Sequence, residues 1–323
     1  MVICVHTAPF LTPGFTPQVQ FLGELLNQFV RVATPFFFLA AGYFFSVSVS
    51  QGRPPLKVGI KLVKRLALFA IFWSCVYILL PIGNLLKPPH PDYLTAVSSL
   101  FKVSMRLSVL VTGTAIHLWF LPAMACALIL LSIACKYRVE KTVGILAAAL
   151  FLAGLAGGAY ADTPLGIPVG MNTRNGPFFS TIFVFTGYFL HKYHVNLTLR
   201  TAYALILGGV ALRLVELAWL MNCYGVHPNK VDYLLGTYPF GVGIFLWLLN
   251  SPWLGENRWM VRLSRYSAGV YCAHLLFVDL LSATPLFLGN PLWEATRPFL
   301  ILGLTLAWVM ILGRVRVLRP LVT

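Results

Sequence analysis

Long apolar runs alternate with short polar breaks along almost the whole chain, and this pattern predicts membrane-spanning helices. A helix needs about 20 mostly apolar residues to cross a bilayer. Counting a shorter first run, Val2–Leu11, we expect about ten membrane segments. The further spans are expected at Phe21–Val49, Leu62–Leu80, Ala115–Cys135, Val143–Tyr160, Phe178–Leu190, Ala202–Met221, Leu234–Leu249, Tyr266–Ala283 and Phe299–Leu312.

The first run, Val2–Leu11, supplies only about half of a span, so it predicts the second half of a helix. Met1 is followed by no positively charged region and no small-residue cleavage site, which does not fit a signal peptide. We therefore expect a first helix that is truncated at its N-terminus, with coding sequence upstream of Met1.

The composition favours the same class of protein. Of the 323 residues, 59% are apolar and 10% are charged, whereas soluble domains carry about 25% charged residues. The net charge of +15 would favour nucleic acid as a partner of a soluble protein, but here the positive residues lie in short loops between apolar runs. The expected fold is an all-α, polytopic membrane helix bundle that forms a single domain over residues 1–323 and contacts the lipid bilayer, not nucleic acid.

Lysine and arginine gather after every second predicted span, and basic loops stay in the cytoplasm. Both termini are then cytoplasmic, and Arg297 is expected in an external loop. The polar segment Tyr93–Thr112 is expected to lie as an amphipathic helix at the outer interface. The basic clusters are Arg53, Lys57, Lys61, Lys64 and Arg65, then Lys136, Arg138 and Lys141, then Lys192 and Arg200, then Arg258, Arg262 and Arg265, and last Arg314, Arg316 and Arg319.

Two ionisable residues near the N-terminus, His6 and Arg31, stand among apolar residues. Ionisable groups at membrane depth are costly and mark functional sites by default. His6 titrates near neutrality and suits a general base, although a packed histidine bonded to a backbone carbonyl is the alternative. Arg31 keeps its charge and needs a partner, for which Glu24, about two helical turns earlier, is one candidate.

Further polar residues occur inside later spans. His117 is expected in the same outer half of the bilayer as His6, and Tyr271 and His274 share a helix face because they lie three residues apart. Arg213 and Glu216 have the same spacing and favour a structural ion pair over catalysis. The six cysteines form no C-x-x-C pair, so neither a disulfide framework nor a metal site is expected.

Four stretches of the chain, taken in their order and spacing, resemble a known pattern. They are His6-Thr7, R-V-A-T-P-F-F-F-L-A-A-G-Y-F from Arg31, H-L-W-F-L from His117, and S-R-Y-S-A-G-V-Y-C-A-H ending at His274. In this order and spacing they resemble the acyltransferase-3 family of multi-pass membrane acyltransferases, which O-acetylate surface sugars. The resemblance spans nearly the whole chain, and within the family it is greatest to the branch that acts on enterobacterial common antigen and similar polysaccharides.

The resemblance implies a ten-helix enzyme of the bacterial cytoplasmic membrane. Such an enzyme would move an acyl group, expected to be acetyl, from cytoplasmic acyl-CoA to a hydroxyl of a cell-surface or lipid-linked sugar, with no other cofactor. It implies that His6 is the family's essential first-helix histidine. The family pairs that histidine with an arginine ten residues before it, a position that falls before Met1 here. The residues implied to bind acyl-CoA are Lys61, Lys64 and Arg65.

On this interpretation His6 takes the proton from the sugar hydroxyl, or attacks the thioester itself, while Arg31 stabilises the developing negative charge. A hypothesis from a different class is a transporter or flippase for a lipid-linked sugar, because intramembrane charges also mark transport pathways. A structural subunit of a polysaccharide complex is a third. The residues expected to bind the acceptor in the first hypothesis are His117, Trp119, Tyr271 and His274.

Overall fold

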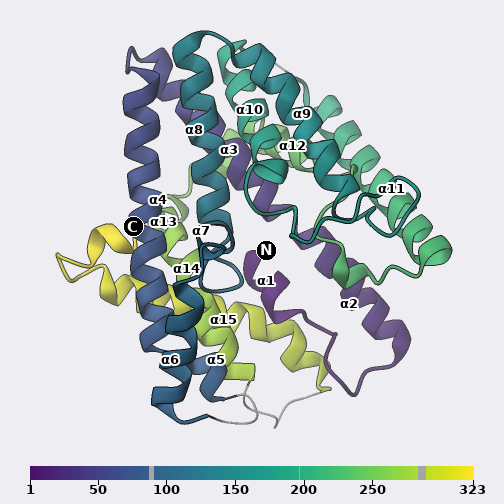
Figure 1. The fold of residues 1–323 in the computed structure, drawn as a ribbon, viewed down its shortest axis with the longest axis vertical. Helices are drawn as coiled ribbons and strands as arrows, with labels where there is room; N and C mark the ends of the chain where they lie inside the picture. The colour runs from purple at the N-terminus through teal and green to yellow at the C-terminus, as the bar shows by residue number, and fades with distance from the viewer. Residues whose placement is uncertain (87–90, 196, 283–288) are drawn as a thin grey trace. The chain divides into compact units, whose positions relative to one another are not determined.

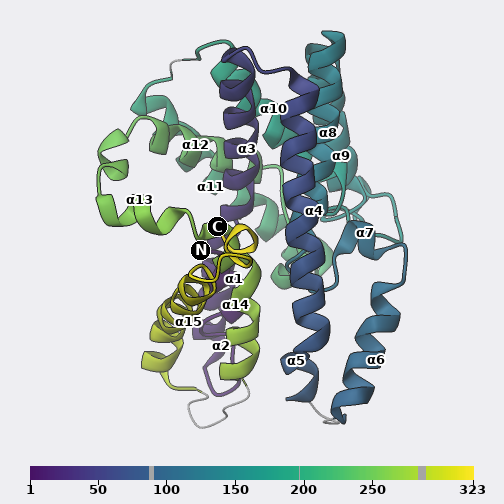
Figure 2. The same ribbon diagram turned by 90° about the vertical axis from the view of Figure 1, so that its left-hand side faces the viewer.

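The structure is a computed structural model that describes residues 1–86, 91–195, 197–282 and 289–323. Throughout these residues the chain forms helices joined by turns and short irregular segments, with no strand (Figures 1 and 2). The predicted all-α class is confirmed. Within the same residues, five helical stretches are long and apolar enough to cross a membrane: Pro17–Ser50, Pro55–Leu85, Phe120–Tyr137, Leu199–Tyr224 and Pro291–Leu312.

The helices gather into two compact units. Unit 1 comprises Met1–Arg31, Ala67–Leu121 and Gly255–Thr323, and unit 2 comprises Val32–Leu66 and Pro122–Leu254. Because the chain enters and leaves unit 1 more than once, its first and last segments share one core. A single domain over residues 1–323 stays a prediction.

Unit 1 is built around the first helix, α1 (Val2–Thr7), which packs on α2 (Pro17–Val30), α14 (Ser267–Ser282) and α15 (Pro291–Leu312). A small core of Ile3, Val278 and Ile301 joins α1, α14 and α15. The unit also holds α5 (Ile82–Leu85), α6 (Tyr93–Ser104), α7 (Val109–Thr112), α13 (Arg258–Ser264) and the second half of α4 (Pro55–Leu79).

In unit 2 the closest packing joins α3 (Ala33–Ser50) to α10 (Pro177–Lys192). A Cβ added at Gly42 would meet the Val184 carbonyl, and one at Gly187 would meet the Leu39 carbonyl. Both glycines therefore let the two backbones approach closely, as small residues do in membrane helix pairs. The other helices are α9 (Glu140–Ala156), α11 (Leu199–Tyr224), α12 (Thr237–Leu249) and most of α8 (Phe120–Tyr137).

Two of the predicted segments end or break where the local backbone requires it. The first helix ends at Thr7 and not at Leu11, because Ala8 turns into the left-handed region just before Pro9, and a residue before proline avoids the helical conformation. The predicted span Phe21–Val49 is two helices, α2 and α3, with a turn at Arg31.

Other boundaries also shift. Tyr93–Thr112 is divided into α6 and α7, and Asp92 caps α6 by accepting from the Thr95 amide at 2.9 Å. The last helix begins at Pro291 and not at Phe299, since Asn290 caps it and proline suits a first helical turn. Arg297 is therefore a helix residue, which corrects its expected place in a loop. Ala283, the predicted end of the ninth span, lies outside the described residues.

Large apolar side chains are exposed along the long helices. On α4 they include Ile60, Leu68, Ile71 and Leu79, and on α11 they include Leu207. Such surfaces are costly in water and suited to lipid. Together with the apolar helix lengths, they indicate a multi-pass membrane protein; the cytoplasmic location of both termini stays a prediction.

Candidate active site

Three histidines that are far apart in the sequence meet in unit 1. The ring centroid of His274 lies 5.1 Å from that of His6 and 5.1 Å from that of His117, and the rings of His6 and His117 lie 6.1 Å apart. His117 and His274 are buried, whereas His6 is half-buried. We call His6, His117 and His274 the histidine cluster.

Each member of the histidine cluster comes from a different segment. His6 lies in the last turn of α1, and His274 lies in the middle of α14. His117 lies in the turn before α8 and not inside a helix, which differs from the predicted span Ala115–Cys135. Because α1 packs directly on α14, His6 and His274 face each other across a helix contact.

Backbone carbonyls of α14 fix the rings of His117 and His274. The Nδ1 of His274 lies 2.6 Å from the Tyr271 carbonyl oxygen, and the Nε2 of His117 lies 3.0 Å from the Cys272 carbonyl oxygen. A carbonyl only accepts hydrogen bonds, so in each ring this nitrogen carries the proton. The other nitrogens, Nδ1 of His117 and Nε2 of His274, are buried and have no hydrogen-bond partner among the described residues. Each is a neutral acceptor that a substrate O–H group can satisfy.

Two tyrosines surround the histidine cluster. Tyr77 of α4 donates its hydroxyl to the Cys272 carbonyl at 2.7 Å, and its ring lies 5.2 Å from that of His117. Tyr271 donates its hydroxyl to the His117 carbonyl, and its ring lies 5.6 Å from the His117 ring. The Cys272 carbonyl thus receives two donors and anchors both Tyr77 and His117. Tyr77 was missed by sequence reasoning, since nothing separates it from any other tyrosine in an apolar run.

Arg31 lies at the end of α2, where it is half-buried. Its Nε donates to the Oδ1 of Asn27 at 3.1 Å, and the Asn27 amide in turn donates to the Val5 carbonyl at 3.1 Å. Arg31 is therefore joined through Asn27 to the backbone next to His6. Trp119 is half-buried and contacts Phe120, with ring centroids 6.4 Å apart.

The basic residues predicted to bind acyl-CoA, Lys61, Lys64 and Arg65, are exposed on the first half of α4, which belongs to unit 2. Among the residues that the structure describes, no group of three His, Cys, Asp or Glu side chains is arranged to hold a metal ion. The roles of all predicted site residues stay predictions.

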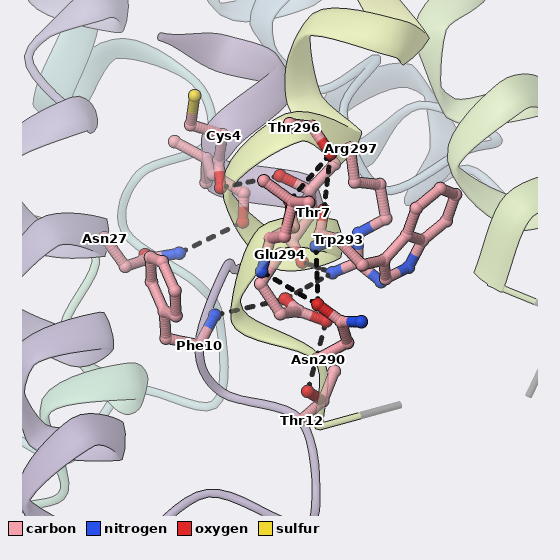
Figure 3. A network of polar contacts seen from close by, with 12 residues as sticks. Cys4, Thr7, Phe10, Thr12, Asn27, Asn290, Trp293, Glu294, Thr296 and Arg297 are labelled. Carbon is pink, nitrogen blue, oxygen red and sulfur yellow. Dashed lines mark hydrogen bonds and ion pairs between the residues drawn. The ribbon is translucent and has the colours of Figure 1, made fainter. Parts of the chain in front are cut away.

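Sequence reasoning also missed a buried ion pair beside the cluster, between Glu294 and Arg297 of α15 (Figure 3). The carboxylate oxygen lies 3.1 Å from the guanidinium nitrogen, and the two residues are 0% and 5% exposed. Arg297 donates to the Thr7 carbonyl, at the end of the helix that carries His6. The i, i+3 spacing was a usable signal, since the same spacing had marked Arg213 and Glu216.

The fold and the histidine cluster define a helical membrane protein with ionisable groups gathered inside a bundle. A family model described as "Acyltransferase domain" matches residues 1–313, and the chain belongs to this family, acyltransferase-3, as the resemblance predicted. The family indicates an acyltransferase. The enterobacterial branch stays a prediction.

Two curated relatives are similar to the chain. A "Serine/alanine racemase" from Enterococcus gallinarum is 28% identical over 80% of this chain and 36% of its own length. An "Amino-acid racemase" from Enterococcus faecalis is 28% identical over 61% of this chain and 28% of its own length. The chain thus spans about a third of the curated relatives it matches. No solved structure matches the chain.

Proposed function

We propose that the chain is a membrane-bound O-acyltransferase that moves an acyl group, acetyl in the first instance, from acyl-CoA to a hydroxyl of a cell-surface or lipid-linked sugar. The observation that carries this proposal is the histidine cluster, in which His117 and His274 present unpaired, neutral ring nitrogens beside His6. The family match supports the acyl-transfer class. The protein would act in the bacterial cytoplasmic membrane, with acyl-CoA arriving from the cytoplasm.

In the proposed reaction the acceptor hydroxyl attacks the thioester carbonyl carbon while His6 takes the hydroxyl proton. A tetrahedral intermediate forms with the negative charge on the former carbonyl oxygen. Its collapse re-forms the C=O bond and breaks the C–S bond. The leaving sulfur takes the proton that His6 had received, so CoA leaves as the thiol and His6 is neutral again. A positioned general base contributes about 10²- to 10⁴-fold to such a rate. Arg31, joined to the α1 backbone through Asn27, would stabilise the developing charge.

The other cluster members would bind the acceptor. Sugar hydroxyls are hydrogen-bond donors, and the Nδ1 of His117 and the Nε2 of His274 are acceptors without a donor among the described residues. The aromatic faces of Tyr271 and Trp119 would contact the sugar ring. Burial makes the two acceptors costly while they are unpaired, so a ligand that satisfies them gains free energy.

The donor would be held by the exposed basic residues Lys61, Lys64 and Arg65, because a CoA thioester carries phosphates and charged hydrogen bonds to phosphate are strong. An amino acid with a hydroxyl group is a second candidate acceptor. The relatives bear the names of racemases that act on amino acids, and the hydroxyl of serine can accept an acyl group as a sugar hydroxyl can.

The test is transfer from radiolabelled acetyl-CoA by the full chain in lipid nanodiscs, with N-acetylglucosamine, galactose and L-serine as acceptors. We expect release of the CoA thiol and a labelled acetyl ester on at least one acceptor. A transporter or flippase, the rival function, releases no CoA thiol. Loss of ester formation in His6→Ala, with the protein folded, supports the assigned base, and an unchanged rate excludes it.

A further inference from the structure

The end of α1 decides where the His6 imidazole lies, because His6 is in the last turn of this helix. The last carbonyls of a helix have no partner within the helix and need one from elsewhere. In α1, the Val5 carbonyl receives the Asn27 amide from α2, and the Thr7 carbonyl receives the Arg297 guanidinium from α15. The two carbonyls on either side of His6 are therefore held by side chains from two other helices.

The segment that follows α1 is held by the same ion pair. Glu294 accepts the Phe10 amide at 3.1 Å through one carboxylate oxygen and the Thr12 hydroxyl at 3.1 Å through the other. In Figure 3 the Glu294 carboxylate lies between this segment and the Arg297 guanidinium. The Arg297 guanidinium thus binds the Thr7 carbonyl before the turn at Ala8, and the Glu294 carboxylate binds the Phe10 amide after this turn.

In this arrangement two buried charged side chains bind backbone groups. A buried ion pair is weak support for stability, since apolar residues of similar volume often serve as well. A helix end near a cation is favoured by the helix dipole, but an exposed lysine would give the same benefit. The contacts at Thr7 and Phe10 instead fix the direction in which the chain leaves α1, and with it the last turn that carries His6.

We infer that Glu294 and Arg297 are positioning residues that hold His6 in register with His117 and His274. The inference rests on the proposed function, because it takes His6 as the base. A misplacement of about 1 Å can cost on the order of 100-fold in rate. Loss of the ion pair should therefore lower kcat and leave the KM for acetyl-CoA nearly unchanged.

The test uses the full chain in nanodiscs and the release of CoA thiol from acetyl-CoA. In the double variant Glu294→Leu/Arg297→Met, apolar side chains replace the pair, so neither charge is left buried alone. We expect kcat to fall by about 10- to 100-fold, with the KM for acetyl-CoA changed by less than about 3-fold. Arg297→Lys, which keeps the cation, should retain more activity than Arg297→Met.

A matched control is Glu216→Gln, which removes a buried carboxylate that also binds backbone amides, but in unit 2. Its kcat should stay within about 3-fold of wild type. In a His6→Ala background the double substitution should cause no further loss, because its effect passes through His6. Hydrogen exchange over residues 2–12 should be faster in the double variant than in the control.

The outcomes separate the two proposals. A wild-type protein that does not cleave acetyl-CoA, or a His6→Ala protein with the wild-type rate, overturns the proposed function and the positioning role with it. The positioning role alone is wrong if His6→Ala loses most of its rate but the folded double variant keeps its kcat. It is also wrong if the double substitution lowers the residual rate of His6→Ala by the same factor as it lowers the wild-type rate. Unchanged exchange over residues 2–12 also overturns it.

Discussion

Glu294 in unit 1 and Glu216 in unit 2 are buried carboxylates that bind backbone amides of other segments. Glu216 accepts the Leu235 amide at 2.9 Å and the Gly236 amide at 2.8 Å, and it receives the Tyr160 hydroxyl. Glu294 accepts the Phe10 amide and the Thr12 hydroxyl. The hydrogen-bonding chemistry is nearly the same in both.

What differs is the group that each carboxylate fixes. Leu235 and Gly236 lead into α12, so Glu216 holds the N-terminal end of an apolar helix, where a negative charge is favoured. Phe10 follows the helix that carries His6, the proposed general base. A buried carboxylate therefore does not by itself indicate a functional site. Its role depends on which segment its hydrogen bonds hold in place.

The largest expected effect compares histidines of the two units. His6→Ala should lower kcat by about 10²- to 10⁴-fold, the usual contribution of a positioned general base. His191→Ala in unit 2 should stay within about 3-fold, because the described hydrogen bond of His191 goes to the Ser46 hydroxyl at 2.9 Å. Initial rates of CoA thiol release measure both. Equal losses of kcat in the two variants would contradict the assignment of the active site to unit 1.

A second expected effect concerns stability. Glu216→Ala leaves the amides of Leu235 and Gly236 without their acceptor. A buried donor without a partner costs about 1–3 kcal/mol, so the free energy of unfolding should fall by at least that order. Thermal unfolding in detergent, followed by circular dichroism, measures the loss. A variant as stable as the wild type would mean that Glu216 does not fix the start of α12.

The comparison also separates what the sequence predicts from what it does not. Helix positions follow from local hydrophobic pattern, and the predicted segments for α9, α10 and α11 lie close to the observed ones. The i, i+3 spacing on one face also marked Tyr271 and His274 correctly as neighbours. Both features depend on residues only a few positions apart.

Contacts between residues that are far apart in the sequence leave no such local pattern. Glu294 and Phe10 are 284 positions apart, and Arg297 and Thr7 are 290 apart. The hydropathy pattern also predicted a loop at Arg297, since a charged residue among prolines and polar residues is typical of a break between spans. The turn at Arg31 was hidden because apolar residues continue on both sides of it.

A third expected effect is on acceptor binding. The Nε2 of His274 is unpaired among the described residues, and its proposed partner is an acceptor hydroxyl. His274→Ala removes that acceptor atom, and a net hydrogen bond is worth about 1 kcal/mol, so the KM for the acceptor should rise by roughly 5- to 10-fold. Initial rates across acceptor concentrations give the KM. A change confined to the KM for acetyl-CoA would place His274 on the donor side.

The smallest expected effect is on the donor. Lys64→Gln/Arg65→Gln removes two exposed positive charges from α4, where salt and water screen each contact. The KM for acetyl-CoA should rise by about 3- to 10-fold, more at low salt than at high salt. Arg53→Gln, another basic residue close to α4, is the matched control. Equal KM values in all three proteins would move the phosphate contacts elsewhere.

Acyl transfer by the histidine cluster of unit 1 leaves two products that can be measured in one assay, free CoA thiol and an acetyl ester. The most direct measurement follows acetyl-CoA, labelled in the acetyl group, with the full chain in nanodiscs and counts both free CoA thiol and acetyl ester on the acceptor. We expect thiol and ester to appear in equal amounts with the wild type and the rates of both to fall by at least about 100-fold in His6→Ala. Labelled ester formed at the wild-type rate by folded His6→Ala, or acceptor carried across vesicles by the wild type without release of thiol, would contradict it.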